Sequence, residues 1–156
     1  MPKVALDRKV PDFSLPATGT SDTWSLKDAA GRKLVIFFYP KDLTSGCTLE
    51  AQGFRDQAAA LRRAGTAVVG ISRDSLASHE KFCLKEKLSY PLLSDTDEKV
   101  CRLFDVIQEK SLYGRKYMGV ERSTFLIDAA GVLRREWRKV KVNGHVEEVL
   151  EAAKSL

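Results

Sequence analysis

Two long apolar runs constrain the fold of this chain more than any other feature. KLVIFFY (33–39) and TAVVGIS (66–72) are continuous stretches of mostly β-branched, aromatic and aliphatic residues. Such runs are typical of strands that are covered on both faces. The segment between them, GCTLEAQGFRDQAAALRRAG (46–65), has helical spacing and ends on Gly65, a residue that favours helix termination. Strand, helix and strand at this spacing predict a right-handed βαβ crossover with parallel strands.

The remaining segments predict a larger mixed sheet. VPDFSLPATGTSDTWSL (10–26) indicates short strands around a Gly/Ser/Thr turn, restricted to edge positions by Pro11 and Pro16. After the crossover we expect helices at 75–88, 97–106 and 145–156, a short apolar segment at 90–95, and strands at 123–128 and 132–137 joined by a hairpin turn at 128–131. Together they predict a three-layer α/β domain, a mixed central sheet with helices on both faces.

Length and composition exclude several classes of protein. With 156 residues, 44% hydrophobic and 30% charged, residues 1–156 are expected to form one domain that buries a core without disulfide or metal staples. No stretch approaches the roughly 18 apolar residues that span a bilayer, and the N-terminus has no secretory h-region. We therefore expect a cytoplasmic protein with no membrane partner. The net charge is +5, but the basic residues are interspersed with acidic ones along the chain. This pattern indicates a solvated surface and no nucleic-acid partner.

Three cysteines, Cys47, Cys83 and Cys101, raise the possibility of redox chemistry. They form no Cys-x-x-Cys pair and no Cys/His cluster at metal-ligand spacing, so we expect no metal site. Thiols in the cytoplasm stay reduced unless chemistry oxidises them. The cysteines are therefore either inert core residues or redox-active ones.

Cys47 lies where the first predicted strand passes into its helix. Functional sites in open α/β sheets form at the carboxyl ends of strands. Unsatisfied N–H groups and the positive end of the helix dipole stabilise a thiolate there. Helical spacing puts Cys47 on the inward face with Glu50 and Phe54. Position alone fits a small buried apolar residue equally well.

Three ungapped segments resemble a known family. FFYPKDLTSGCTLE (37–50) is similar to the peroxidatic segment of peroxiredoxins, YPLLSDTDEKV (90–100) to the region that follows, and ERSTFLID (121–128) to a second signature. The chain most resembles the bacterioferritin-comigratory, or Q-type, branch. This resemblance implies a thioredoxin-like fold and a thiol-dependent peroxidase for hydrogen peroxide and organic hydroperoxides. It implies no metal, flavin or haem cofactor.

The resemblance also implies roles for individual residues. The Cys47 thiolate would attack the peroxide and become a sulfenic acid. Thr44 would hold both reactants through its hydroxyl, and Pro40 would shield the thiolate from solvent. Arg122 would stabilise the anion and polarise the O–O bond. Glu50 would support the reaction by orienting an arginine such as Arg122.

The resolving cysteine follows a less common pattern. Many Q-type members carry it five residues after the peroxidatic cysteine, where this chain has Gln52, and Ser45 replaces a frequent proline. A subset of the branch carries it on the helix after the second crossover strand, which implies Cys83. The resemblance then implies an intramolecular Cys47–Cys83 disulfide, recycled by thioredoxin or a similar dithiol, in a monomer.

Placement within the predicted helices favours Cys83 over Cys101. The apolar face of helix 75–88 is expected to consist of Leu76, Leu84 and Leu88. Cys83 would lie at the edge of that face, close to the surface, whereas Cys101 would pack in the core. Because a disulfide requires Cα atoms within about 7 Å, we expect local unfolding around 44–52 and 78–88 on oxidation.

Other functions remain open at this point. The nearest is a one-cysteine peroxidase, in which an external thiol such as glutathione resolves Cys47. A non-enzymatic redox or nucleic-acid-binding module finds its best support in the basic segment LRREWRKVKV (133–142), which contains Trp137. A thioredoxin-like oxidoreductase is disfavoured because Cys47 has no partner at Cys-x-x-Cys spacing.

Overall fold

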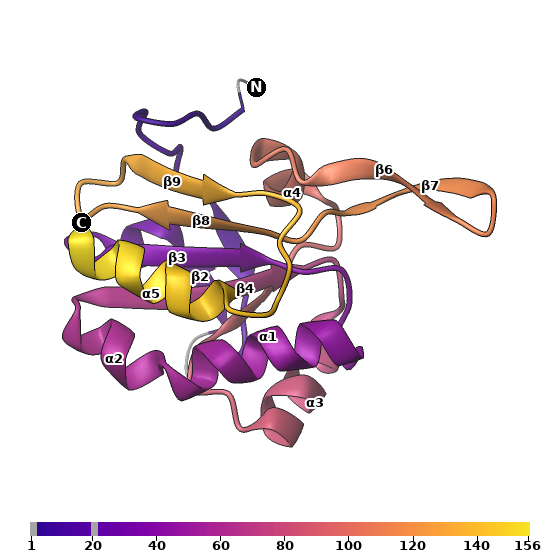
Figure 1. Ribbon diagram of the computed structural model, residues 1–156, viewed down its shortest axis with the longest axis horizontal. Coiled ribbons are helices and arrows are strands. Elements are labelled where there is room, and N and C mark those ends of the chain that lie inside the picture. The colour runs from indigo at the N-terminus through magenta and orange to yellow at the C-terminus, as the bar shows by residue number, and fades with distance from the viewer. Residues whose placement is uncertain (1–2, 20–21) are drawn as a thin grey trace.

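A central sheet of five strands organises the computed structural model, which describes residues 3–19 and 22–156 (Figure 1). The strand order is β5-β4-β3-β8-β9. The strands are β3 (Lys33–Phe38), β4 (Thr66–Ser72), β5 (Leu92–Ser94), β8 (Ser123–Ile127) and β9 (Leu133–Trp137). The pairs β3–β4 and β4–β5 are parallel, whereas β3–β8 and β8–β9 are antiparallel. The predicted mixed sheet and its parallel crossover are confirmed.

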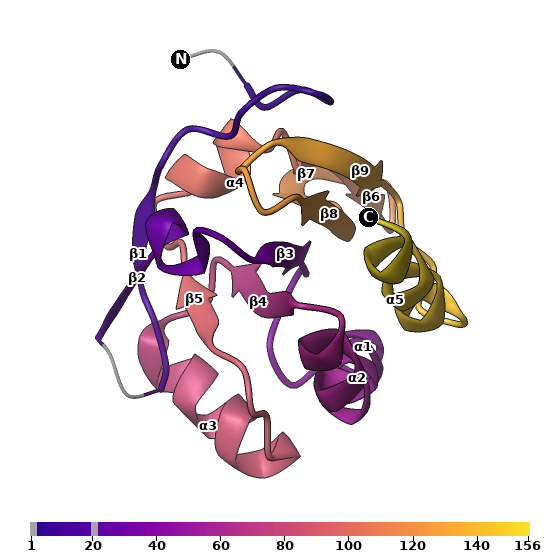
Figure 2. The ribbon, with the colours of Figure 1, turned by 90° about the vertical axis from the view of Figure 1, so that its left-hand side faces the viewer.

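Helices cover both faces of this sheet (Figure 2). The helices are α1 (Ser45–Asp56), α2 (Ala58–Arg63), α3 (Leu76–Glu86), α4 (Lys99–Leu103), α5 (His145–Ser155) and a 3₁₀ turn, η1 (Leu26–Ala29). Apolar residues of α1, α2, α3 and α5 pack on one face together with Val35 and Phe37 of β3. Those of η1 and α4 pack on the other face with Ile36 and Phe38. The alternation along β3 thus divides the core into two apolar clusters.

The helix expected at 46–65 is interrupted. It consists of α1 and α2, which meet at Gln57, where φ is −98° and ψ is 5°. Gly53, shortly before the break, allows α5 to approach, because a Cβ there would lie 2.8 Å from a methyl carbon of Val146. Gly65 has φ +69°, the left-handed geometry expected of a helix terminator.

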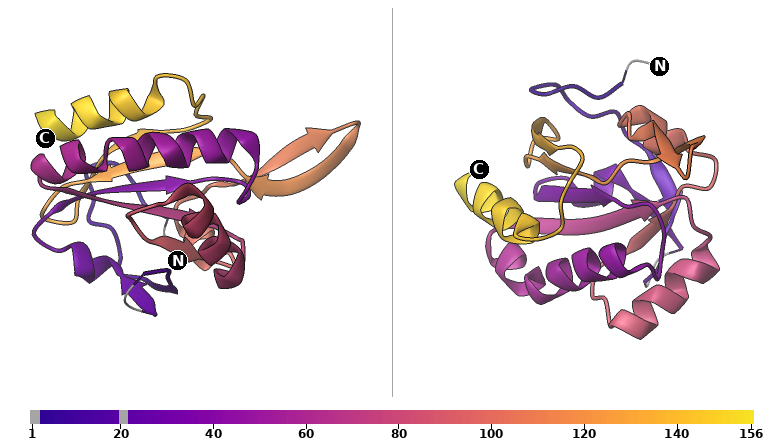
Figure 3. Two further views of the ribbon diagram at one scale, coloured as in Figure 1. Left: turned by 90° about the horizontal axis from the view of Figure 1, so that it is seen from below. Right: turned by 45° about the vertical axis from the view of Figure 1, so that its right-hand side comes forward.

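A hairpin that the sequence analysis did not identify projects from the body of the molecule (Figure 3). It pairs β6 (Ile107–Leu112) with β7 (Arg115–Val120). Tyr113 and Gly114 form its two-residue turn, and both have positive φ, as a type I′ turn requires. β7 ends two residues before Arg122, so the hairpin leads directly into the predicted site.

The N-terminal strands are present as β1 (Ser14–Pro16) and β2 (Thr23–Ser25), which pair antiparallel. Part of the turn expected between them, at residues 20 and 21, lies outside the described residues. In the ranges 3–19 and 22–156, none of the helices combines the length and apolar composition needed to cross a bilayer.

Candidate active site

Cys47 is the third residue of α1 and lies beyond the carboxyl end of β3. Thr44, in extended geometry, is the N-cap residue of this helix. The Cys47 side chain is only 1% exposed and belongs to the apolar cluster between the sheet and α1. Its thiol is free and faces the interior, as helical spacing predicts. A buried sulfur at a helix start satisfies both interpretations of Cys47 until its polar neighbours are considered.

Arg122 is the neighbour that distinguishes these interpretations. Its Nη2 donates to Cys47 Sγ at 3.4 Å, and its Nη1 donates to Glu50 Oε1 at 2.7 Å. Gly46 eases this approach, since a Cβ at that position would make a tight contact of 3.1 Å with Arg122 Nη2. Arg122, which lies 75 positions after Cys47 in the chain, therefore brings a positive charge to the thiol. The carboxylate of Glu50, on the same helix as Cys47, holds the guanidinium in this position.

Glu50 is fully buried, and this position changes its acid–base behaviour. Burial raises the pKa of Glu50 to about 7, although the Arg122 guanidinium opposes the shift. Its Oε2 has no hydrogen-bond partner within the described part of the chain. Burial acts to lower the pKa of Arg122, but the charges of Glu50 and Cys47 outweigh it and raise that pKa. The arginine stays charged beside the sulfur.

A second cation, Lys110 on β6, lies within electrostatic range of this cluster. Burial, and then the charge of Arg122, lowers the pKa of Lys110, while the charge of Cys47 opposes the shift. Gly119 on β7 leaves room for it, because a Cβ there would lie 3.2 Å from Lys110 Cδ. The sequence analysis missed Lys110 because it assigned no structure to the hairpin.

The loop before α1 places Pro40 and Thr44 near the start of the helix. Pro40 is half-buried directly after Tyr39. The Thr44 hydroxyl donates to the Lys41 carbonyl at 2.8 Å, which is a contact within the turn. Leu43 has φ +66°, an unfavourable backbone geometry for a branched side chain and one that often occurs near functional sites. While it donates to Lys41, the Thr44 hydroxyl can still accept a hydrogen bond from another group.

A buried polar network links this loop to α3. Asp42 accepts hydrogen bonds from Tyr39 Oη at 2.6 Å and Ser78 Oγ at 2.8 Å. His79 Nδ1 lies 2.7 Å from Asp42 Oδ2, and His79 Nε2 donates to the Leu93 carbonyl at 3.0 Å. Asp42, Asp74 and His79 also have the spacing of a metal site. Because the atoms of Asp42 and His79 are already hydrogen bonded to protein groups, we interpret the cluster as structural.

The apolar face predicted for α3 is wrong. Leu84 is 80% exposed, whereas the buried residues of this helix are His79, Phe82 and Glu86. The polar network is the physical reason, because Asp42 turns His79 inward and Phe82 and Glu86 follow at helical spacing. A lone histidine in an amphipathic helix was the available signal, and the sequence analysis did not use it.

Cys83 nevertheless lies beside the buried face. Its thiol is free and half-buried, and its Sγ lies 3.5 Å from Thr18 Oγ1. Burial raises the pKa of the Cys83 thiol, while the hydrogen bond with Thr18 opposes the shift. Trp24 and Tyr90 line a pocket of about 400 Å³ with this cysteine.

The sheet separates Cys101 from the other two cysteines. Cys47 and Cys83 belong to or pack against the same apolar cluster. Cys101 is fully buried in the cluster on the opposite face. Burial, and then the charge of Asp95, raises the pKa of the Cys101 thiol far above its usual range. Cys101 thus lies in the core, as expected from its apolar neighbours.

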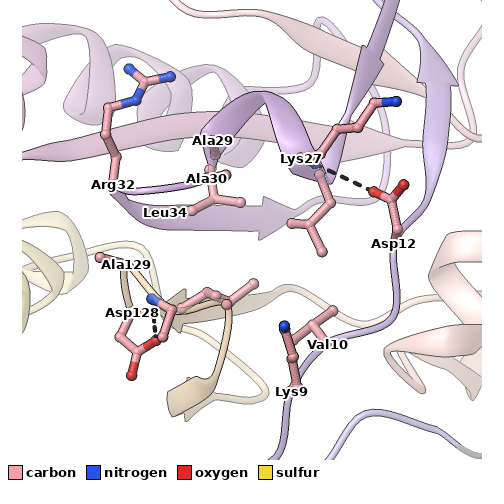
Figure 4. A pocket seen from close by; sticks show the side chains of 14 residues that line it. Lys9, Val10, Asp12, Lys27, Ala29, Ala30, Arg32, Leu34, Asp128 and Ala129 are labelled. Atoms are coloured by element: carbon pink, nitrogen blue, oxygen red, sulfur yellow. Dashed lines mark hydrogen bonds between the residues drawn. The ribbon is translucent and has the colours of Figure 1, made fainter.

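A further pocket of about 360 Å³ lies away from this chemistry (Figure 4). Leu34, near the start of β3, and Ile127, at the end of β8, are among the residues that line it. Lys9, Lys27 and Arg32 lie around it. Since Cys47 follows the opposite end of β3, this pocket is not part of the candidate active site.

Part of the basic segment 133–142 is engaged within the protein. Arg134 bonds to Asp7 and Asp128, and Arg138 donates to the carbonyls of Phe104 and Asp105. The indole of Trp137 donates to Glu148. These contacts leave fewer free cations for phosphate contacts than the sequence indicates.

Comparisons with known proteins agree with the geometry. Residues 6–136 match the model of the AhpC/TSA family. Peroxiredoxin Bcp of Xanthomonas campestris is 46% identical over 158 residues, covering 99% of this chain and 98% of that protein. Peroxiredoxin Bcp of Bacillus subtilis is 43% identical over 153 residues, covering 98% of this chain and 97% of that protein.

A solved structure of Xanthomonas campestris peroxiredoxin Q has a TM-score of 0.87 at 47% identity, covering 92% of this chain and 90% of that one. A cysteine-to-serine variant of Xylella fastidiosa PrxQ has a TM-score of 0.91 at 38% identity, covering 97% and 96%.

Proposed function

The chain belongs to the AhpC/TSA family, in its peroxiredoxin Bcp (Q-type) branch, and is a thiol peroxidase with a thioredoxin-type fold; from this premise we propose how it works. Cys47 reduces hydrogen peroxide and organic hydroperoxides and becomes a sulfenic acid. The alkyl peroxide reduction activity of the Xanthomonas campestris relative supports the inclusion of organic hydroperoxides. One observation carries the proposal: Arg122 contacts both the Cys47 sulfur and the buried Glu50 carboxylate.

In the first step, the Cys47 thiolate attacks one peroxide oxygen. An S–O bond forms, the O–O bond breaks, and the leaving oxygen takes a proton to become water or an alcohol. Arg122 stabilises the thiolate and the charge that develops on the leaving oxygen, and Glu50 holds the guanidinium in place. Thr44 orients the peroxide through its hydroxyl, and Pro40 limits access of water to the sulfur.

We propose that Cys83 resolves the sulfenic acid. Its position next to the apolar cluster of Cys47 supports this role, and the location of Cys101 across the sheet argues against the alternative. Formation of the bond requires local unfolding around residues 44–52 and 78–88, since both thiols start within folded helices. Thioredoxin or a similar dithiol then reduces the disulfide, as a reducing compartment such as the cytoplasm permits. The enzyme acts as a monomer in this scheme.

Mass spectrometry after one equivalent of hydrogen peroxide tests this scheme. Peptide mapping under non-reducing conditions is expected to yield a Cys47–Cys83 crosslink. The Cys101→Ser variant, as the matched control, should form the same crosslink, whereas Cys83→Ser should accumulate sulfenic or sulfinic acid at Cys47.

Two other outcomes of this experiment would contradict the proposed scheme. A stable oxidised Cys47 beside a free Cys83 in the unsubstituted protein would indicate the one-cysteine mechanism with an external thiol. An unmodified Cys47 would refute the peroxidatic assignment of this residue.

A further inference from the structure

The last turn of α3 is tied to α1 by two side chains. Gln52 Nε2 donates to Glu86 Oε1 at 2.7 Å, and Arg55 Nη1 donates to the Glu86 backbone carbonyl at 2.7 Å. Glu86 is buried although it is the final residue of the helix. We refer to Gln52, Arg55 and Glu86 as the latch. It joins the helix that carries Cys47 to the helix that carries Cys83.

The helix end held by the latch is the weaker end of α3. The residue after Glu86, Lys87, has φ +54°, a left-handed geometry that is unfavourable for a side chain with a Cβ. The amides of Lys87 and Leu88 both donate to the carbonyl of Cys83. The carbonyl of Glu86 has no acceptor role within the helix and depends on Arg55. Loss of the latch therefore favours fraying of the turn that contains Cys83.

The opposite end of α3 is held much more firmly. Ser75 caps the helix by accepting from the amide of Ser78. His79 and Ser78 bond to Asp42, and His79 also bonds to the carbonyl of Leu93. The side chains of His79 and Asp42 are at most 1% exposed. Cys83 thus lies between a firmly anchored helix start and a helix end held by two hydrogen bonds from α1.

We propose that the latch sets the rate at which Cys83 reaches oxidised Cys47, an inference that rests on the proposed Cys47–Cys83 disulfide. When Glu86 leaves Gln52 and Arg55, the last turn of α3 unwinds while Ser78 and His79 stay bonded to Asp42, which confines the unfolding proposed around 78–88 to the part after His79. Cys83 then attacks the sulfur of the Cys47 sulfenic acid. An S–S bond forms, the S–O bond breaks, and the hydroxyl departs with the thiol proton as water.

The latch also governs sensitivity to excess peroxide. While it is closed, Cys47 remains a sulfenic acid, and a second peroxide molecule can oxidise it to a sulfinic acid. A tighter latch lengthens this interval, and a looser one shortens it. Gln52 and Arg55 are therefore positioning residues for the resolving step, and they act through Glu86.

Rapid-quench mass spectrometry of Gln52→Ala and Arg55→Ala tests this proposal. After one equivalent of hydrogen peroxide, we expect the first-order rate constant for disulfide formation to rise about fivefold, as loss of one hydrogen bond implies. The concentration of peroxide that converts half of Cys47 to sulfinic acid should rise in the same proportion. The rate of the first oxidation step is measured separately, so that a change there is not mistaken for faster resolution.

Two controls separate the latch from general destabilisation. Lys85→Ala alters an exposed residue on the same turn of α3, and Ile127→Val removes a buried methylene on the other face of the sheet. Both should leave the disulfide rate unchanged. In the reduced protein, amides near Cys83 should exchange faster in Gln52→Ala than in either control.

The outcomes are distinguishable. If the unsubstituted protein forms the crosslink and Gln52→Ala forms it no faster, the latch proposal is wrong and the proposed function stands. If the rate also rises in Ile127→Val, general stability controls resolution and the latch proposal is again refuted. If no Cys47–Cys83 crosslink appears in the unsubstituted protein, the resolving mechanism fails together with the latch.

Discussion

The acid–base behaviour of Glu50 and the two contacts of Arg122 determine the chemical environment of Cys47. Glu50 is the first inward-facing residue after Cys47 on α1, and its burial without a second partner keeps its proton affinity high. Arg122 compensates the Glu50 charge and still has one nitrogen free to contact sulfur. The planar guanidinium makes the two contacts through two different nitrogens held in a rigid fork, a geometry that the single nitrogen of a lysine lacks. The site thus depends on one side chain that serves two anionic partners.

Replacement of this arginine tests that dependence. In Arg122→Lys, we expect kcat/KM for hydrogen peroxide to fall about 100-fold, because a single ammonium nitrogen replaces a planar fork of two nitrogens that stabilises developing charge. Competition kinetics against a second peroxidase would measure the loss. Arg63→Lys, at an exposed position of α2, serves as the control and should retain full activity. Equal activity of the two variants would contradict the proposed role of Arg122.

The raised pKa of Glu50, about 7, predicts a pH dependence of stability. Between pH 4.5 and 7 the folded protein binds more protons than the unfolded chain, so the Glu50 contribution is present at pH 4.5 and lost as the pH rises through 7. Its size is on the order of 3 kcal/mol. Urea unfolding of the unsubstituted protein and Glu50→Gln across this range should reveal the difference. Parallel stability curves for the two proteins would refute the prediction.

At the scale of elements, partners elsewhere in the fold override local pattern. α3 and the residues just after it carry three leucines that suggest an apolar face, yet Leu84 is exposed because Asp42 draws His79 inward. The β6–β7 hairpin lacks the alternation of a half-buried strand because it projects from the body, and Tyr113 at its tip is 97% exposed. Hydrophobic periodicity indicates burial only where an element packs against the core.

The start of α5 provides an element-scale prediction. His145, its first residue, lies 2.8 Å from Thr124 Oγ1 on β8, and burial lowers its pKa to about 4. Below pH 6.5 the unfolded chain binds the proton more readily, so this stability contribution is lost as the pH falls from 6.5 through 4. We expect a loss on the order of 3 kcal/mol.

Urea denaturation between pH 4 and 7 measures this effect. The slope should be reduced in His145→Gln, which keeps a polar side chain but does not titrate in this range. A slope equal to that of the unsubstituted protein would show that α5 docking does not depend on neutral His145.

At the scale of the whole molecule, the central sheet supports the candidate active site and also separates the cysteines. It holds Cys47 and Cys83 on one side and Cys101 on the other. The predictions of one domain over residues 1–156 and of a monomer stay predictions. The mixed sheet with helices on both faces, by contrast, is confirmed and follows from alternation along β3, which serves two apolar clusters at once.

The sequence by itself determined the parallel crossover and the place of Cys47. KLVIFFY and TAVVGIS have the continuous apolar character of doubly covered strands, and a cysteine at the following helix start is a local feature. The family resemblance implied Arg122 as a partner of that cysteine, but only the tertiary structure decided the geometry of their contact, the inward face of α3 and the contact between Gln52 and Glu86. The physical reason is distance along the chain: these contacts join residues 34 to 75 positions apart, and no local periodicity encodes which buried polar groups will satisfy one another.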